Sequence, residues 1–278
     1  MPESAITADG VVQSADGTKL QYRAWPNPGS TVTLAVVHGL SDHSGRYTNF
    51  ANGMTKHGLA TFAVDLRGHG KSPGRRGHVD SWSQWTDDVS AFVHYVESVT
   101  GGEVVPVGHS FGGAALLSTV LSGKLPQTRR FVVSSPALKL KFAAPAWKVR
   151  LGVLASKVVP KLSMSDEVDP GGISRMPDVV AAYRADPLVH GKISSRMFTE
   201  WQAATSDILA RADQIEMPFL ILAGTADPII DPEGSRLLHQ KSAAMSDLHL
   251  LEGGYHEPFN DQDSDEVFAL IGGWLARL

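Results

Sequence analysis

The stretch Val104-Val-Pro-Val-Gly-His-Ser-Phe-Gly-Gly-Ala-Ala-Leu-Leu-Ser-Thr-Val-Leu121 decides the fold of this chain. Its apolar, β-branched beginning predicts a buried strand over Val104–Val107, and its end predicts a helix over Ala114–Leu121. The connection Gly108-His-Ser-Phe-Gly112 must turn sharply between the two. Such a turn exposes Ser110 and strains its backbone. Glycines flank Ser110 in this connection because residues with side chains would collide in so tight a turn.

Similar apolar runs recur along the chain. They predict strands at Val11–Gln13, Leu20–Trp25, Thr33–His38, Thr61–Val64, Phe131–Ser134, Pro218–Leu222 and Leu248–Leu251. Helical spacing predicts helices at Tyr47–His57, Ser81–Val99, Pro232–Ala244 and Glu266–Leu278. Strands that alternate with helices indicate an α/β fold with a mostly parallel central sheet flanked by helices. Pro106 departs from this pattern, because proline cannot donate a hydrogen bond inside a central strand.

Residues 139–211 break the alternation. We find no convincing strand there, and prolines interrupt the helical fragments. We interpret this region as a helical insertion that forms a lid over the strand ends. The predicted organisation is a core of residues 1–138 and 212–278 with a cap of residues 139–211.

The composition excludes several classes of function. Hydrophobic residues make up 42% and charged residues 19% of the 278 residues, which is typical of a globular chain with a large core. A formal net charge of −4 argues against nucleic-acid binding, which needs a basic surface. Cysteine is absent, so neither a disulfide nor a thiolate metal site can form, and a reducing cytoplasmic location is expected. The N-terminal residues lack the features of a secretory signal, and no apolar stretch approaches the ~20 residues that span a bilayer.

A serine hydroxyl becomes a useful nucleophile only when a base removes its proton. After a turn of this kind, an acid and then a histidine are expected at the ends of later strands. Asp227 follows the strand predicted at Pro218–Leu222, and His256 follows the one predicted at Leu248–Leu251. We therefore predict an α/β-hydrolase arrangement with Ser110 as nucleophile, His256 as base and Asp227 as the acid that orients the histidine. Three rival residues have simpler explanations. Asp231 is expected at the start of a helix, His239 on the surface of a helix and His249 inside a strand.

Two backbone N–H groups must stabilise the oxyanion of the tetrahedral intermediate. One is expected to be the amide of Phe111, directly after the nucleophile. The other should come from the loop after the strand at Thr33–His38, where we nominate the amide of Leu40. Gly39 would allow that loop to approach closely. No histidine or carboxylate set has the spacing of a metal site, so neither a metal nor another cofactor is expected.

Several motifs, in order along the chain, closely resemble the monoacylglycerol lipase and lysophospholipase-like family of α/β-hydrolases. They are His38-Gly-Leu-Ser-Asp-His-Ser-Gly-Arg-Tyr47, Asp65-Leu-Arg-Gly-His-Gly-Lys-Ser72, Gly108-His-Ser-Phe-Gly-Gly113, Ala182-Tyr-Arg-Ala-Asp-Pro-Leu188 and Gly254-Tyr-His-Glu257. The resemblance runs from about Val11 to the C-terminus and includes the predicted lid. It implies a capped hydrolase that cleaves monoacylglycerols into fatty acid and glycerol.

The resemblance also assigns a polar, glycerol-binding end of the site. A loop acid and arginine of the family correspond to Asp42 and Arg46, with aspartate in place of the family's glutamate. Tyr183 corresponds to a lid tyrosine at the glycerol exit. Two positions depart from the pattern: Phe111 replaces a common methionine, and Pro258-Phe259 lies where the human-type enzyme has a second histidine. The simpler alternative is that Asp42 and Arg46 pair with each other and Tyr183 is a packed aromatic residue.

The beginning of the insertion carries a second pattern. Trp147, Leu151, Leu154 and Val158 recur at helical spacing, so residues 145–159 predict an amphipathic helix. Its basic residues and close neighbours are Lys139, Lys141, Lys148, Arg150, Lys157 and Lys161. The apolar stripe either packs onto the core, or partly faces outward and makes a peripheral contact with a membrane.

The predicted activity is hydrolysis of lipid monoesters through an acyl-enzyme on Ser110, with monoacylglycerols as the substrate. A general carboxylesterase, a lysophospholipase or a thioesterase would share the fold and the triad. A non-catalytic binding protein with this fold is a further alternative, but such proteins usually lose a triad residue. The expected partners are a lipid ester and, through the lid, a membrane surface, with no nucleic acid.

Overall fold

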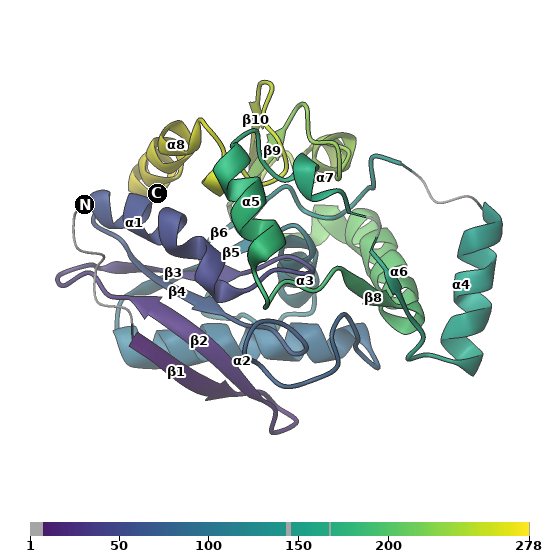
Figure 1. The fold of residues 1–278 in the computed structure, drawn as a ribbon. Coiled ribbons are helices and arrows are strands. Elements are labelled where there is room, and N and C mark those ends of the chain that lie inside the picture. Colours follow the sequence, from purple (N-terminus) through teal and green to yellow (C-terminus); the bar gives the residue numbers. More distant parts are fainter. Residues whose placement is uncertain (1–7, 143–145, 167, 278) are drawn as a thin grey trace.

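A central sheet organises the part of the chain that the structure describes (Figure 1). The structure is a computed structural model and describes residues 8–142, 146–166 and 168–277. The sheet strands are β1 (Ala8–Gln13), β2 (Lys19–Trp25), β3 (Val32–Val37), β4 (Ala60–Val64), β5 (Glu103–His109), β6 (Phe131–Ser134), β9 (Phe219–Gly224) and β10 (Ser246–Leu251). Their order is β1-β2-β4-β3-β5-β6-β9-β10. Only the β1–β2 and β2–β4 pairs are antiparallel, which confirms the predicted, mostly parallel sheet.

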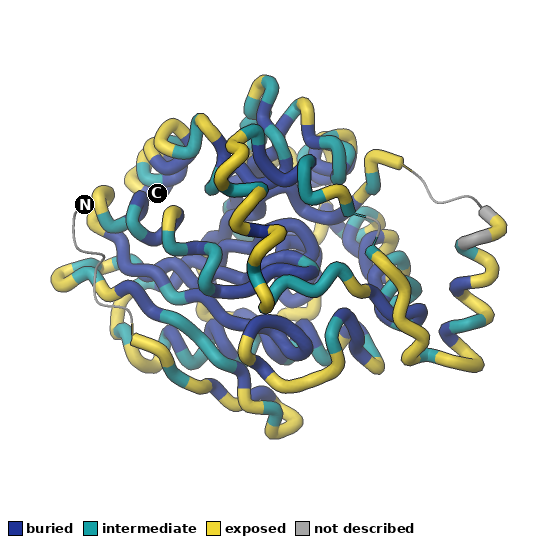
Figure 2. The backbone as a smooth tube through the Cα atoms, viewed as in Figure 1, coloured by how far each residue is buried: buried dark blue, intermediate teal, exposed yellow. Residues whose placement is uncertain are grey.

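Helices cover both faces of this sheet. On one face lie α1 (Thr48–Lys56) and α8 (Ser264–Arg277), and on the other α2 (Trp82–Thr100), α3 (Phe111–Leu121) and α7 (Glu233–Lys241). In β3, Leu34 and Val36 face the first group, whereas Ala35 and Val37 face the second. All four side chains are buried, because a strand covered on both faces needs apolar residues at successive positions. Figure 2 shows the buried strands at the centre of the sheet and the more exposed backbone of β1 at its edge. Short 3₁₀ helices are η1 (Ser44–Tyr47), η2 (Pro170–Gly172), η3 (Ala212–Gln214) and η4 (Pro258–Asn260).

Pro106 lies within β5, at a level where the strand has one paired neighbour. β5 pairs with β3 there, with Ala35 opposite Pro106. Its pairing with β6 begins only at Val107. The proline therefore occupies a stretch in which β5 is locally an edge, and an edge tolerates a residue without an N–H.

Residues 139–211, which we call the insertion segment, lie between β6 and β9. The segment contains α4 (Ala146–Val158), β7 (Ser163–Ser165), α5 (Pro177–Ala185), β8 (Lys192–Ser194) and α6 (Ser195–Arg211). β7 and β8 form an antiparallel pair with Met164 opposite Ile193. The prediction that this region contains no strand was therefore wrong. Each strand is 3 residues long, which is too short for an alternating pattern to be recognised.

The helix α6 attaches the insertion segment to the rest of the fold. Its residues Met197, Trp201 and Ile208 are buried in the core beside α3. The Trp201 indole N–H also donates a hydrogen bond to the carbonyl of Ala137 at 2.8 Å. By contrast, α4 packs against α6 and lies at the outer edge of the molecule (Figure 1). The segment thus has a buried inner helix and an outer helix with an exposed side.

Candidate active site

The turn between β5 and α3 holds Ser110 in a strained backbone conformation with positive φ, at φ 53° and ψ −121°. The Ser110 amide donates to the carbonyl of Ser134 at 2.9 Å. Position 112 must be glycine, since a Cβ there would lie 2.3 Å from the backbone oxygens of both Val37 and His38. The turn is therefore packed tightly against the end of β3, which places Ser110 at the carboxyl edge of the sheet.

Ser110, His256 and Asp227 form a continuous hydrogen-bonded chain. Asp227 follows β9 and His256 follows β10, so both lie beyond the carboxyl ends of adjacent parallel strands. His256 Nε2 lies 3.0 Å from Ser110 Oγ, and His256 Nδ1 lies 2.7 Å from Asp227 Oδ2. The second oxygen of Asp227 accepts hydrogen bonds from the amides of Ile229 at 2.8 Å and Ile230 at 2.9 Å, which fixes the carboxylate. The structure thus brings the predicted residues together in the geometry that a base-activated hydroxyl requires.

The electrostatic environment of His256 suits a base. Burial by itself lowers the pKa of His256, but the negative charge of Asp227 and its hydrogen bond outweigh burial and raise that pKa above its ordinary value. The neighbouring His109 has its ring centroid 4.9 Å from that of His256. Burial and the proximity of His256 lower the pKa of His109 to about 4, so His109 is uncharged at neutral pH and does not repel a proton on His256.

The rival residues have other partners. The carboxylate of Asp231 lies 2.9 Å from Lys139 Nζ and accepts a backbone hydrogen bond at the start of α7. His239 Nδ1 lies 2.8 Å from Ser246 Oγ, and His249 lies inside β10. None of these three contacts involves Ser110.

The predicted oxyanion donors belong to backbone next to Ser110. Leu40 follows β3, and Phe111 is the first residue of α3. Gly39 allows the loop after β3 to approach the serine, since a Cβ on Gly39 would lie 3.0 Å from Ser110 Cβ. Both Leu40 and Phe111 line the pocket that Ser110 faces. Their role as oxyanion donors stays a prediction.

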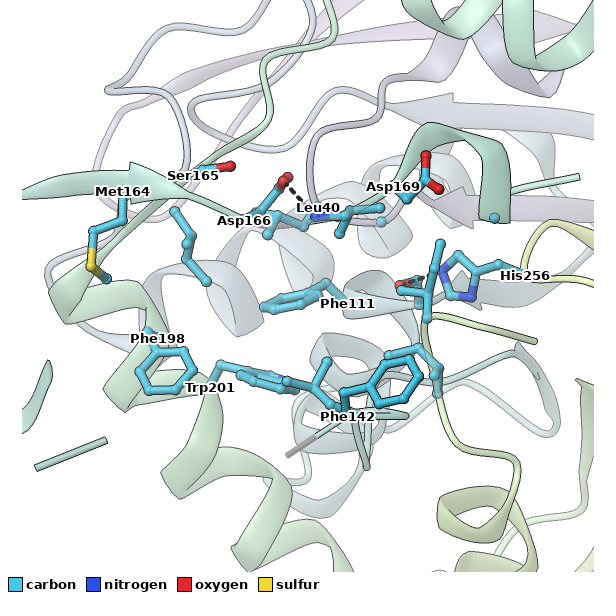
Figure 3. A pocket seen from close by; sticks show the side chains of 18 of the residues that line it. Leu40, Phe111, Phe142, Met164, Ser165, Asp166, Asp169, Phe198, Trp201 and His256 are labelled. Carbon is cyan, nitrogen blue, oxygen red and sulfur yellow. Dashed lines mark hydrogen bonds between the residues drawn. The ribbon is translucent and has the colours of Figure 1, made fainter. Parts of the chain in front are cut away.

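A pocket of about 970 Å³ is lined by Ser110 and His256 together with residues of the insertion segment. This volume lies in the range of sites for small-molecule ligands. Figure 3 shows two facing walls, with Phe111 between them. Ser165, Asp166 and Asp169 lie on one wall, with their oxygens directed away from the aromatic residues, and the other wall is aromatic, from Phe142, Phe198 and Trp201. The ring of Phe111 stacks on Trp201 with centroids 4.9 Å apart, which links the nucleophile turn to the aromatic wall.

The residues assigned to the polar end meet around a buried arginine. Arg46 Nη1 donates to Asp42 Oδ1 at 3.0 Å, and the guanidinium carbon lies 4.6 Å from the centroid of the Tyr183 ring. Burial raises the pKa of Asp42, but the charge of Arg46 outweighs burial and lowers it well below its usual range. The alternative in which Asp42 and Arg46 pair with each other therefore holds in the structure. Asp42 and Tyr183 also line the pocket.

Sequence reasoning missed Glu257, the second and closer partner of Arg46. Its two carboxylate oxygens accept from Arg46 Nη1 and Nη2, both at 2.7 Å. The side chains of Arg46 and Glu257 are only 9% and 8% exposed, so this is a buried bidentate ion pair. Glu257 directly follows His256, which was a usable signal, but its partner lies 211 residues away in sequence. The pair connects the loop that carries Leu40 with the loop that carries His256.

Comparison with known proteins decides the family. Residues 30–263 match the family described as serine aminopeptidase, S33. The chain belongs to this family of α/β-hydrolases. It is 30% identical over 266 residues to the monoacylglycerol lipase of Mycolicibacterium smegmatis, a match that covers 93% of each chain. It is 29% identical over 270 residues to human monoglyceride lipase, covering 95% of this chain and 89% of the relative.

Solved structures resemble this hydrolase over nearly its whole length. The monoacylglycerol lipase of Paleococcus ferrophilus has a TM-score of 0.82 at 31% identity, covering 98% of this chain and 99% of that one. A monoglyceride lipase variant from Saccharomyces cerevisiae has a TM-score of 0.86 at 23% identity, covering 99% and 96%, which shows the shared fold. The predicted α/β-hydrolase fold and the predicted resemblance to monoacylglycerol lipases are confirmed. The hydrolase also matches an uncharacterised abhydrolase domain-containing protein of Dictyostelium discoideum, at 32% identity over 266 residues, but spans only 28% of that protein's length.

Two further properties of the described residues bear on function. Across residues 8–142, 146–166 and 168–277, no group of three or more histidine, cysteine, aspartate or glutamate side chains is placed to hold a metal ion. Across the same residues, no helix has the length and apolar character needed to cross a membrane.

Proposed function

We propose that this hydrolase cleaves lipid monoesters, with monoacylglycerols as the preferred substrate, through an acyl-enzyme on Ser110. The observation that carries the proposal is the Asp227–His256–Ser110 chain, with distances of 2.7 and 3.0 Å, at a pocket with an aromatic wall. The relatives named as monoacylglycerol lipases support the same substrate class.

The chemistry proceeds in two halves. His256 Nε2 takes the proton of Ser110 as the hydroxyl oxygen attacks the ester carbonyl, and Asp227 stabilises the resulting imidazolium. The amides of Leu40 and Phe111 stabilise the oxyanion, after which the bond to the alcohol breaks and His256 returns the proton to the leaving alkoxide. Water, deprotonated by His256, then attacks the acyl-enzyme by the same sequence and releases the fatty acid. The insertion segment acts as the lid that shields these steps from bulk water.

The pocket suits both the acyl chain and the glycerol of a monoacylglycerol. The aromatic wall of Phe142, Phe198 and Trp201 provides apolar surface for an acyl chain. At the polar end, the guanidinium of Arg46 is already paired with Asp42 and Glu257. The carboxylates that line the pocket already accept hydrogen bonds within the protein, and their negative charge disfavours a phosphate. This arrangement favours glycerol over the head group of a lysophospholipid.

The helix α4 is the surface through which a membrane-borne substrate would reach the pocket. Its side chains Trp147, Leu151 and Val158 are 64%, 57% and 70% exposed. Trp147 and Leu151 also line the pocket, so one apolar surface continues from the outside of α4 into the site. An exposed apolar helix with basic residues nearby gains from insertion into an anionic membrane surface. We therefore include peripheral membrane contact of a cytoplasmic enzyme in the proposal.

A substrate panel tests the proposed activity. Purified protein is compared on monoacylglycerols, diacylglycerols, lysophosphatidylcholine, acyl thioesters and 4-nitrophenyl esters, each at matched short and long acyl lengths. We expect monoacylglycerols to give the highest kcat/KM, and a fluorophosphonate probe to label the wild type but not Ser110→Ala. Higher kcat/KM on short aryl esters would indicate a general carboxylesterase, and an unlabelled wild type would exclude a serine hydrolase.

Vesicle co-sedimentation tests the membrane contact. Ser110→Ala protein should bind anionic vesicles at low salt and bind them less at high salt, because screening weakens the attraction of basic residues. Trp147→Glu should abolish the binding. Absence of binding at low salt, or binding that is indifferent to Trp147→Glu, would show that α4 does not contact membranes.

A further inference from the structure

A strained serine lies directly beside the predicted oxyanion donor Leu40. Among the described residues, the non-glycine residues with positive φ are Ser41 (60°), Ser110 (53°) and Ser135 (43°). The turn at the nucleophile explains Ser110. Ser41 is 1% exposed, and its positive φ is a backbone conformation that residues with a side chain rarely adopt. Such a conformation persists only where the surroundings hold it.

The contact that holds Ser41 comes from the insertion segment. Ser41 Oγ donates to Asp166 Oδ2 at 2.7 Å, across 125 residues of sequence. His190 Nδ1 lies 3.3 Å from the same hydroxyl, but it accepts a hydrogen bond from the Lys192 amide at 3.1 Å and so does not donate to Ser41. The charge-assisted bond to Asp166 is therefore the stronger one.

Asp166 is itself fixed within the insertion segment. Its amide donates to the carbonyl of Gly191 at 3.2 Å, and its Oδ1 accepts from the amide of Val168 at 3.2 Å. Asp166 follows β7, so its position depends on the pairing of β7 with β8. In Figure 3, Asp166 and Leu40 lie on the same wall of the pocket. A shift of the insertion segment would therefore pull on the loop that carries Leu40.

The two neighbours of Leu40 are constrained from opposite sides. Gly39 is pressed against the nucleophile, where a Cβ would lie 3.0 Å from Ser110 Cβ. Ser41 is bonded to Asp166. We infer that Ser41 is a positioning residue: its bond to Asp166 sets the direction of the Leu40 amide and couples docking of the insertion segment to stabilisation of the oxyanion. This inference rests on the proposed esterase function.

The test compares Ser41→Gly, Asp166→Asn and the double variant on a soluble 4-nitrophenyl ester. Glycine adopts a φ of 60° without strain, so Ser41→Gly removes the hydroxymethyl group and its hydrogen bond without straining the backbone. Loss of an oxyanion donor costs about 10²–10³ in kcat, so a misdirected donor should cost on the order of tenfold, with KM within about twofold of the wild type. Because both residues act through one bond, the double variant should lose no more than either single variant. Affinity for a trifluoromethyl ketone, whose adduct carries an oxyanion, should weaken by the same factor as kcat/KM.

Ser135→Gly is the matched control. It relieves the same kind of backbone strain, with φ 43°, but among the described residues the Ser135 hydroxyl has no hydrogen-bond partner to lose. We expect its kcat to stay within about twofold of the wild type. Thermal unfolding of each variant separates loss of activity from loss of folding.

Three outcomes would overturn the inference: unchanged kcat in Ser41→Gly, a raised KM with unchanged kcat in Asp166→Asn, or additive losses in the double variant. The second outcome would make Asp166 a substrate contact. Turnover of the aryl ester by the wild type is measured first and does not depend on the glycerol head group. A wild type that hydrolyses no ester would refute the proposed function itself, whereas an active wild type with indifferent variants would refute only the role of Ser41.

Discussion

Replacing Glu257 with glutamine should destabilise the hydrolase and shift its pH dependence in a defined direction. Both carboxylate oxygens of Glu257 bind Arg46 at 2.7 Å, and both side chains are less than one tenth exposed. Glutamine keeps the shape but turns an N–H group toward the guanidinium. Removing one partner of a buried ion pair costs about 3–5 kcal/mol. Because Asp42 still neutralises Arg46 from 3.0 Å, we expect the lower end, about 3 kcal/mol.

Calorimetry measures this loss of folding stability directly. For a chain of this size, 1 kcal/mol corresponds to roughly 2 °C in Tm, so Glu257→Gln should unfold about 6 °C below the wild type. Asp265→Asn is the control, because the Lys56–Asp265 pair is 3.9 Å apart, with side chains 73% and 89% exposed. An exposed pair of this kind contributes almost nothing to stability.

The pH dependence of kcat/KM gives a second, independent readout. The negative charge of Glu257 is one of the influences that raise the pKa of His256. Removing that charge lowers the pKa, and since the neutral ring is the active base, the acid limb of the profile should move to lower pH. An unchanged Tm would show that the Arg46 pair does not stabilise the fold. An acid limb that moves to higher pH would contradict the electrostatic reasoning.

Three further predictions concern other parts of the fold. Asp227→Asn should lower kcat by about 10⁴-fold, whereas Asp231→Asn should retain most activity; the reverse result would reassign the acid. Gly112→Ala should yield little folded protein, because its Cβ would lie 2.3 Å from two backbone oxygens, and a Tm equal to that of the wild type would disprove the steric argument. Burial lowers the pKa of His190 from 6.5 to about 4 in the folded state. The unfolded chain therefore binds more protons between these pH values, and stability should fall as the pH drops from 6.5 toward 4. His190→Gln should show a shallower decrease of Tm over that range; an unchanged slope would exclude His190 as a contributor.

The sequence was sufficient to predict the strands of the sheet and the candidate catalytic residues around Ser110. Continuous apolar runs such as Thr33–His38 predict strands covered on both faces, and G-x-S-x-G between a strand and a helix is a local steric pattern. Asp227 and His256 could be nominated because parallel strands end at one edge, so residues just beyond those ends converge whatever their separation in sequence. Periodicity and chain order carried these predictions, and neither requires knowledge of side-chain contacts.

Tertiary structure alone decided the contacts between distant segments. The three-residue pair β7–β8 has no recognisable period, and Pro106 is explained only by where β6 joins the sheet. The bonds from Arg46 to Glu257 and from Ser41 to Asp166 span 211 and 125 residues. The first depends on how the segments after β3 and β10 are placed relative to each other, and the second on how the insertion segment is placed against the loop after β3. The sequence shows which groups a charged or hydroxyl side chain can bind, but only the packing of the segments determines which residue becomes its partner.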